Sequence, residues 1–169
     1  MAKRGSLREF QAHLATRLAG AGDKNAAGLL GVQAGAEYWL INLSDSGEIV
    51  PLVPLTGVPL TQHWFIGIAN IRGNLYSVAD FSAFQGKEQT PQNATSRLLL
   101  IGTRHGNNAA LLVTRMLGLR NQDALTPATA DADAPAWAQE AYTDNDGRRW
   151  KMLNVRELLA DEHFMEIGI

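Results

Sequence analysis

The stretch Gly67–Phe81, which reads GIANIRGNLYSVADF, decides how the surrounding chain folds. Two runs suited to β-strands flank the pair Gly73-Asn74. Such a pair predicts a two-residue hairpin turn, because glycine adopts the positive φ of the turn without steric cost. With this turn, Arg72 opposes Leu75, and every later pair along the hairpin is fixed in register.

The two faces of the predicted hairpin differ in polarity. The later pairs are Ile71 with Tyr76, Asn70 with Ser77, and Ala69 with Val78. Opposed residues share a face because side chains alternate along each strand. The expected core face carries Ala69, Ile71, Tyr76 and Val78. The other face carries Asn70, Arg72 and Ser77. This pattern alone leaves open whether the arginine meets a partner or only solvent.

The bulk composition limits the classes of protein that the chain can represent. Its 169 residues suffice for one domain, or two very small ones, with 46% hydrophobic and 19% charged residues. The net charge of −2 gives no general attraction for nucleic acid or anionic membranes. The absence of cysteine excludes disulfides and thiol chemistry. The charged, amphipathic start predicts neither a signal peptide nor a membrane span, so we expect a cytoplasmic protein.

A helix is predicted at each end of the chain. The helix predicted at 6–19 begins with the capping box Ser6 and Glu9. Its apolar stripe consists of Leu7, Phe10, Leu14 and Leu18. A second capping box, Asn154 with Glu157, begins a closing helix that is expected to run to about His163.

Between these helices the sequence predicts about eight short strands separated by turn residues, as in a small all-β barrel or a pair of them. Pro51 and Pro54 lack the donors of a central strand, so their segment is expected at a sheet edge or in a loop. Gly118 is expected to bend or bulge its strand. A short helix is predicted near Trp137–Tyr142. The polar stretch 85–96 is expected to divide the β portion into two halves.

No arrangement of residues in the sequence points to catalysis or to a metal. The four histidines are scattered without metal-ligand spacing. The run Asp144-Asn145-Asp146-Gly147 lacks the further acids of a calcium loop and predicts a turn. Phosphate-loop, dinucleotide and nucleophile-elbow motifs are absent, so we expect no enzyme and no cofactor.

Three classes of function remain open on the residues alone. A binding or scaffold module would use an exposed sheet and the Arg72 hairpin. A small β-barrel that binds nucleic acid would use Trp150 and the basic residues beside it. An enzyme would need a site assembled from residues that are distant in the sequence.

The same residues resemble the CheW family, the adaptor proteins of bacterial chemosensory arrays, from about Gly28 to Leu159. The motifs that carry the resemblance are Gly47-Glu48-Ile49, Trp64-Phe65-Ile66-Gly67, Asn70-Ile71-Arg72-Gly73, Val78-Ala79-Asp80-Phe81, Leu98-Leu99-Leu100-Ile101 and Leu153-Asn154-Val155-Arg156-Glu157. Residues 59–65 and 72–78 are most similar to the branch of the family in the pathway that governs type IV pili and twitching motility.

The resemblance implies an all-β fold of two packed SH3-like five-stranded β-barrels, with N- and C-terminal helices. It gives a CheW-like domain at 28–169, and the helix predicted at 6–19 lies outside it, in an N-terminal helical extension at 1–27. The expected activity is that of a non-enzymatic adaptor, which joins the cytoplasmic tip of a chemoreceptor to the regulatory domain of a CheA-like histidine kinase. The receptor, a helical hairpin, is expected to lie between the barrels, with no nucleic acid bound and no direct insertion into a membrane.

The resemblance also assigns partner-binding residues to this chain. They are Glu48, Asn70, Ile71, Arg72 and Gly73. Two features depart from the family pattern. Gln62 stands where a proline is usual, and residues 121–136 match poorly.

Overall fold

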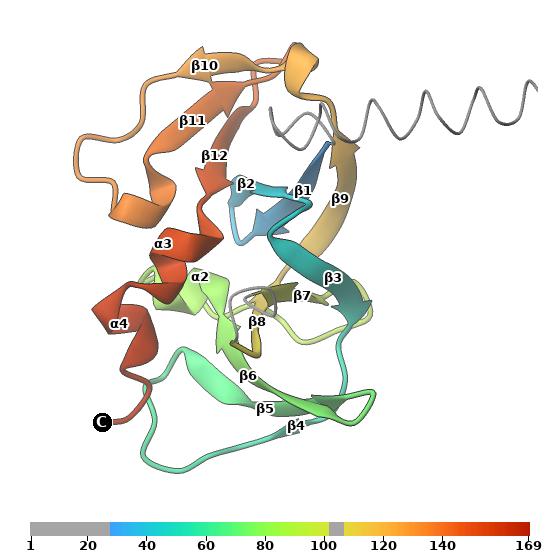
Figure 1. Ribbon diagram of the computed structural model, residues 1–169, viewed down its shortest axis with the longest axis vertical. Coiled ribbons are helices and arrows are strands. Elements are labelled where there is room, and N and C mark those ends of the chain that lie inside the picture. Colours follow the sequence, from blue (N-terminus) through green and yellow to red (C-terminus); the bar gives the residue numbers. More distant parts are fainter. Residues whose placement is uncertain (1–27, 102–106) are drawn as a thin grey trace, which may run out of the picture.

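The strands form two sheets of six strands each, which pack together as two small β-barrels (Figure 1). The computed structural model describes residues 28–101 and 107–169, so the helix predicted at 6–19 lies outside the described residues. We call the two sheets the terminal barrel and the central barrel, after the parts of the chain that form them. They confirm the predicted all-β fold.

The terminal barrel combines strands from both ends of the described chain. Its order is β10 (Thr126–Ala128), β11 (Glu140–Thr143), β12 (Arg149–Leu153), β2 (Glu37–Asn42), β1 (Leu29–Ala34) and β9 (Arg115–Arg120). The central barrel has the order β3 (Ser46–Pro51), β7 (Arg97–Ile101), β8 (Ala109–Val113), β6 (Asn74–Asp80), β5 (Phe65–Ile71) and β4 (Leu55–Thr56). Pairing is antiparallel except between β12 and β2 and between β6 and β8.

The chain therefore leaves the terminal barrel after β2, builds the whole central barrel, and returns with β9. The stretch 85–96 connects α2 (Phe81–Phe84) to β7, both next to strands of the central barrel, so it does not divide the two barrels as expected. Its composition marks a loop correctly, but composition carries no information about which sheet the next strand joins. The buried Asp80 carboxylate fixes this loop, because it accepts hydrogen bonds from Thr90 N and Oγ1, both at 2.7 Å.

The hairpin of β5 and β6 has a different register from the predicted one. Ile71 pairs with Asn74 and Ala69 with Tyr76, which puts Arg72 and Gly73 in the turn. Both turn residues have positive φ, 53° and 86°, as a type I′ turn requires. The register differs by two residues, an even number, so the predicted faces are unchanged and the residues of the expected core face are buried.

Other local predictions are confirmed at β3 and β9. The strand β3, which ends at Pro51, lies at a sheet edge. At Gly118 the ladder to β1 contains a bulge: Gly31 pairs with Gly118 and Val32 with Met116.

The predicted closing helix is two short helices. Asn154 caps α3 (Val155–Leu159) by accepting a hydrogen bond from Glu157 N, and Asp161 caps α4 (Glu162–Met165) in the same way. The helix predicted near 137–142 is wrong beyond its first residues. A 3-10 turn, η3 (Ala136–Ala138), is followed by β11, where cross-strand pairing replaces helical bonding. A second 3-10 turn, η2, spans Gln122–Ala124.

Three apolar clusters form the core. One lies inside the central barrel and contains Ala69, Ile71, Tyr76, Val78, Leu98, Leu100, Ala110 and Leu112. A smaller one lies inside the terminal barrel around Leu29, Leu40 and Trp150. The largest draws residues from both barrels, including Leu30, Trp39 and Ile41 on one side and Leu99, Ile101 and Leu111 on the other. This shared cluster joins the barrels and defines an inter-barrel face on each.

Candidate functional site

The hairpin tip carries an ion pair to the neighbouring edge strand. Arg72 donates from both terminal nitrogens to the Glu48 carboxylate on β3, with Nη1 2.8 Å from Oε2. The side chains remain 63% and 39% exposed. A two-bond arginine–carboxylate pair has a defined orientation, so this cation is held at one place on the surface instead of moving freely.

The local backbone supports the same arrangement. Asn70 Oδ1 accepts a hydrogen bond from Gly73 N at 2.9 Å, which closes the turn from inside. Arg72 adopts φ 53°, a left-handed conformation that is unfavourable for a side chain with a Cβ. Because such strain persists only where surrounding contacts impose it, the position of Arg72 is determined by the hairpin and not by its own preference.

The electrostatics of the pair follow from its geometry. The hydrogen bond from Arg72 holds the pKa of Glu48 below its ordinary value, and the carboxylate raises the pKa of Arg72. Both groups are therefore charged throughout the neutral pH range. Because both are exposed to solvent, salt screens their attraction, and the pair positions the arginine more than it stabilises the fold.

The five residues predicted to bind partners occupy different environments. Arg72 and Glu48 form the ion pair, and Asn70 and Gly73 build the turn beneath it. The side chain of Ile71 is buried in the central barrel, so it supports the hairpin from below.

A second surface feature, an apolar strip, was not found from the sequence. It consists of Leu43, Ile49, Met116 and Leu119. Met116 and Leu119 are 45% and 69% exposed, and they pair with Val32 and Leu30 of the shared cluster, so they lie on the inter-barrel face of β9. Leu43 and Ile49 pack against the same cluster and remain partly exposed.

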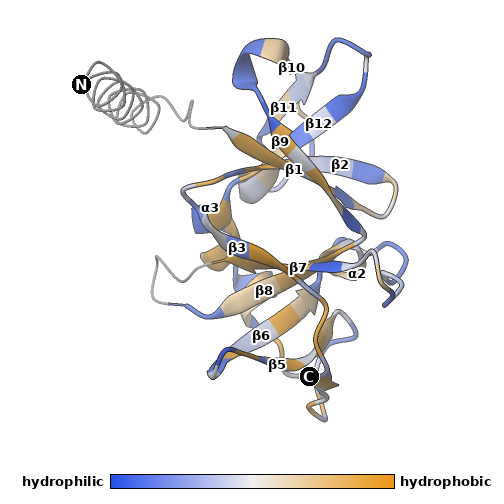
Figure 2. Cartoon of the chain, turned by 90° about the vertical axis from the view of Figure 1, so that its right-hand side faces the viewer, coloured by the Kyte–Doolittle hydropathy of each residue, from blue (hydrophilic) through white to orange (hydrophobic). Residues whose placement is uncertain are grey.

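Ile49 follows Glu48 on β3, so its side chain points to the face of that strand opposite the carboxylate of the ion pair. The strands β9 and β3 belong to different barrels and both face the viewer in Figure 2. The bulge at Gly118 hides the alternation that would have indicated the strip in the sequence.

The residues that suggested nucleic-acid binding do not form a stacking surface. Trp150 is fully buried, and its indole nitrogen donates to Asp144 at 3.0 Å. Arg148 lies over the ring of Tyr38 at 4.1 Å. A buried indole cannot stack on a base, so the basic residues around it lack the aromatic platform that single-stranded nucleic acid requires.

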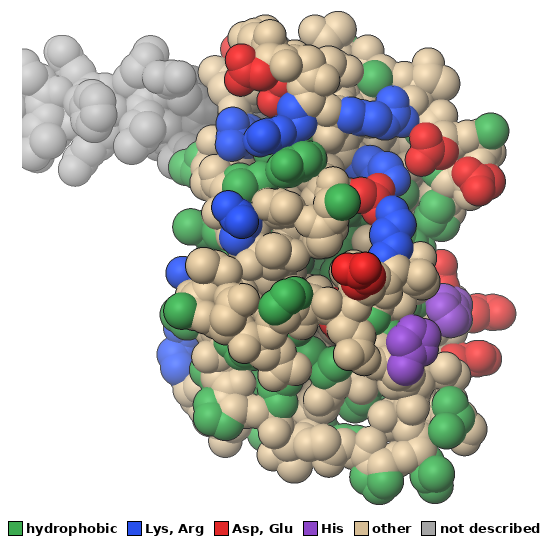
Figure 3. Space-filling model, turned by 180° about the vertical axis from the view of Figure 1, so that it is seen from behind, with side chains coloured by type: hydrophobic (Ala, Val, Ile, Leu, Met, Phe, Trp, Pro, Cys, Tyr) green, Lys and Arg blue, Asp and Glu red, His purple; other side chains and the backbone are tan. Residues whose placement is uncertain are grey.

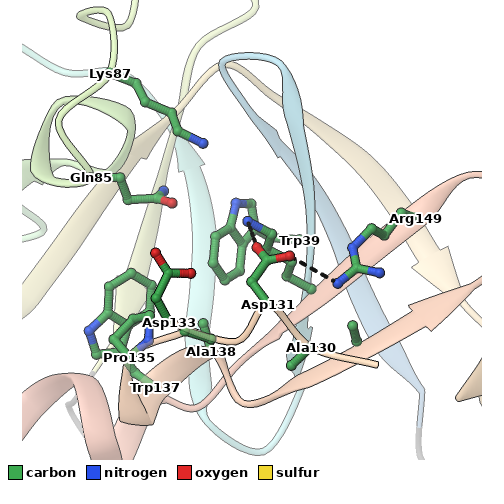
Figure 4. Close-up of a pocket in the computed structure, with 13 residues that line it drawn as sticks. Trp39, Gln85, Lys87, Ala130, Asp131, Asp133, Pro135, Trp137, Ala138 and Arg149 are labelled. Carbon is green, nitrogen blue, oxygen red and sulfur yellow. Dashed lines mark hydrogen bonds and ion pairs between the residues drawn. The ribbon is translucent and has the colours of Figure 1, made fainter. Parts of the chain in front are cut away.

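A polar pocket of about 270 Å³ lies beside Trp39 and Trp137 (Figure 4). At its edge, Glu37 forms ion pairs with Lys87 and Lys151, and Asp131 lies 3.4 Å from Arg149. Burial raises the pKa of Glu37, but hydrogen bonds from the two lysines outweigh it and leave the pKa below its ordinary value. All the charged residues of its lining except Asp133 form ion pairs, and the pocket is smaller than most ligand sites. We therefore assign no ligand to it.

Within 28–101 and 107–169, no group of three or more acidic or histidine side chains is arranged to hold a metal ion. In the same ranges, no helix has the length and apolar character needed to cross a membrane.

Comparison with known proteins gives the family. The family model described as a CheW-like domain matches residues 28–163. The chain belongs to the CheW family. The match begins at residue 28, where the described residues begin.

Two relatives of the family are similar to this chain. Protein PilI of Pseudomonas aeruginosa is 27% identical over 93 residues, which cover 54% of this chain and 51% of PilI, so the chain aligns with about half the length of that relative. The crystal structure of the scaffolding protein TtCheW from Thermoanaerobacter tengcongensis superposes with a TM-score of 0.67 and 18% identity, covering 83% of this chain and 96% of TtCheW. This likeness confirms the CheW-like pair of barrels.

Proposed function

We propose that this protein is a non-enzymatic adaptor of a chemosensory system in the cytoplasm. It joins the cytoplasmic tip of a methyl-accepting chemoreceptor to the regulatory domain of a CheA-like histidine kinase. The likeness to PilI over 93 residues supports a role in controlling type IV pilus-driven twitching motility. Membership of the CheW family supports the adaptor role in general.

The observation that carries this proposal is the exposed arginine at the tip of the β5–β6 hairpin. Arg72 is strained, oriented by two hydrogen bonds to Glu48, and still mostly open to solvent. An arginine presented in this way is preorganised for a partner, because little conformational freedom remains to be lost on binding. Arginine is also enriched among residues that dominate binding energy.

The apolar strip supports a helical partner. A helical hairpin offers apolar residues along one face with polar residues at its margin. The strip would receive that apolar face, and the Arg72–Glu48 pair would form part of the polar rim.

An adaptor needs a second surface for its second partner. Four exposed apolar residues belong to the loop before β5 and to the last residues of the chain, which bond to that loop: Val58, Leu60, Met165 and Ile169. The hydrogen bond from Ile169 N to Leu60 O, at 3.0 Å, joins the chain end to the loop before β5. Figure 3 shows hydrophobic side chains gathered at this lower end of the molecule. We propose this end patch for the kinase.

The test is binding of the purified protein to a chemoreceptor tip and, separately, to a CheA-type regulatory domain. We expect Arg72→Ala to weaken receptor binding at least about tenfold, the loss typical of a hot-spot arginine. Its melting temperature should be unchanged, because the side chain is outside the core. Leu60→Asp is expected to weaken only kinase binding.

Arg156→Ala serves as the matched control, since Arg156 is an exposed arginine on α3. Full receptor-dependent control of the kinase by a folded Arg72→Ala protein would refute the assignment of Arg72. Binding to neither partner, together with salt-dependent binding to a labelled oligonucleotide, would favour the nucleic-acid alternative instead.

A further inference from the structure

The apolar strip has no cover among the described residues, although it adjoins the point where the described chain begins. Leu29 pairs with Arg120, and Leu30 with Leu119, so β1 starts directly beside the exposed end of β9. On the other side of β1, a Cβ built on Gly28 would lie 3.5 Å from Leu43 Cδ1. The 27 residues before Gly28 are thus attached at the strip itself.

The sequence of these 27 residues suits an apolar strip on this domain. Between positions 6 and 19 the apolar stripe Leu7, Phe10, Leu14 and Leu18 recurs at helical spacing. Five of the 15 basic residues and two of the 17 acidic residues fall within 1–27. This segment therefore carries a net charge of +3, and the remaining chain carries −5. Opposite net charges favour association of the segment with its own domain.

The connection is long enough for the segment to reach the strip. A helix over residues 6–19 would be about 21 Å long at 1.5 Å per residue. The eight residues between it and Gly28 span at most about 26 Å, and the six-residue strand β9 is about 20 Å long. The glycines at positions 20 and 22 allow the chain to reverse.

We propose that residues 6–19 bind the apolar strip of their own chain, with the Leu7–Leu18 stripe against Met116 and Leu119. The segment is an internal ligand that occupies the surface until a receptor displaces it. The displacement step rests on the function proposed above, but docking of the segment does not.

The chain itself supplies the reporters for a test. It has four methionines, Met1, Met116, Met152 and Met165, and no cysteine. A nitroxide attached to a Thr16→Cys variant of the full chain would sit opposite the apolar stripe and leave the stripe unmodified. In methionine-methyl NMR spectra, we expect the Met116 signal to lose most of its intensity. The Met165 signal, from the exposed side chain at the other end of the molecule, should persist.

Two further variants decide whether the stripe and the strip bind each other. Leu14→Asp in the segment and Leu119→Asp on the strip should each restore the Met116 signal. Leu60→Asp, an equally drastic change at an exposed leucine in the end patch, should leave the broadening unchanged. An unaffected Met116 signal in the first experiment, or broadening that survives Leu14→Asp, would overturn the proposal.

Two further experiments, mixing of differently labelled chains and addition of a receptor tip, test the other possible occupants of the strip. Broadening that appears when spin-labelled chain is mixed with isotope-labelled, nitroxide-free chain would mean that the segment binds a second copy, contrary to the proposal. Addition of a receptor-tip hairpin should restore the Met116 signal. If the segment docks but the hairpin does not displace it, the internal ligand stands, and the receptor surface proposed above is wrong.

Discussion

Gly67 is the position where a single added methyl group is most informative about this fold. It lies in β5 with φ 140°, and a Cβ there would be 2.5 Å from Thr56 O and 3.0 Å from Thr56 C. These are backbone atoms of β4, which pairs with β5 through Thr56 and Ile68. They cannot rotate away as a flexible side chain would, so Gly67→Ala must move one strand from the other.

The loss of stability expected for Gly67→Ala has two parts. Holding a residue with a Cβ at such a positive φ costs about 1–3 kcal/mol, and overpacking against fixed atoms costs about 1–3 kcal/mol. We therefore expect Gly67→Ala to lower the free energy of unfolding by about 2–6 kcal/mol. Gly147→Ala is the matched control, because Gly147 has φ 83° and open space around its Cβ position. It should lose only about 1–2 kcal/mol.

Urea unfolding followed by circular dichroism measures this difference. With a slope of about 2 kcal/mol per molar urea, an excess of about 2 kcal/mol separates the two midpoints by about 1 M. Hydrogen exchange at Leu55 and Thr56 would show whether β4 detaches locally to relieve the contact. Equal midpoints for the two variants, without faster exchange in β4, would refute the close approach of β4 to Gly67.

Two further predictions concern charge. Val78→Asp should unfold the central barrel or cost about 4 kcal/mol or more, because it places an unpaired carboxylate at a fully buried position; an unchanged melting temperature would show that the side chain is not in the core. Glu37 has a pKa below its ordinary value because of Lys87 and Lys151, so its contribution to stability is present at neutral pH and is lost as the pH falls through that lowered pKa. The Glu37→Gln variant should therefore be less stable than the unchanged protein at pH 7, and it should lose less stability as the pH falls below about 5. Unfolding measured at a series of pH values checks both effects. Parallel pH profiles for the two proteins would contradict the role of the lysine pairs.

The surroundings of Arg72 could be predicted from the sequence only in part. Its place near a hairpin turn follows from the turn signal Gly73-Asn74, although the structure puts Arg72 in the turn itself. Its partner does not, because Glu48 is 24 residues earlier, on a strand that reaches the hairpin only through the folded barrel. The register error has a similar origin: Gly73-Asn74 suits a turn by itself, but Arg72-Gly73 satisfies the turn when Asn70 bonds to Gly73 N.

The apolar strip could not be predicted from the sequence, for a different reason. Met116 and Leu119 belong to a strand whose alternation is broken by a bulge, and their exposure depends on β9 having no neighbour beyond β1. Whether a leucine is buried or open at a sheet edge is decided by the strands that join that sheet.

The sequence by itself determined local features of this protein: the polarity of the two faces of the hairpin, the cap at Asn154, and the edge position of Pro51. These depend on sterics and hydrogen bonds between residues a few positions apart. Only the tertiary structure decided that the chain interleaves its two barrels, returning to β1 with β9 instead of dividing at 85–96. It also decided that Arg72 meets Glu48 and that Met116 and Leu119 stay exposed. Those outcomes depend on which distant strands pair, and pairing is settled by the burial of the shared core, which no local pattern records.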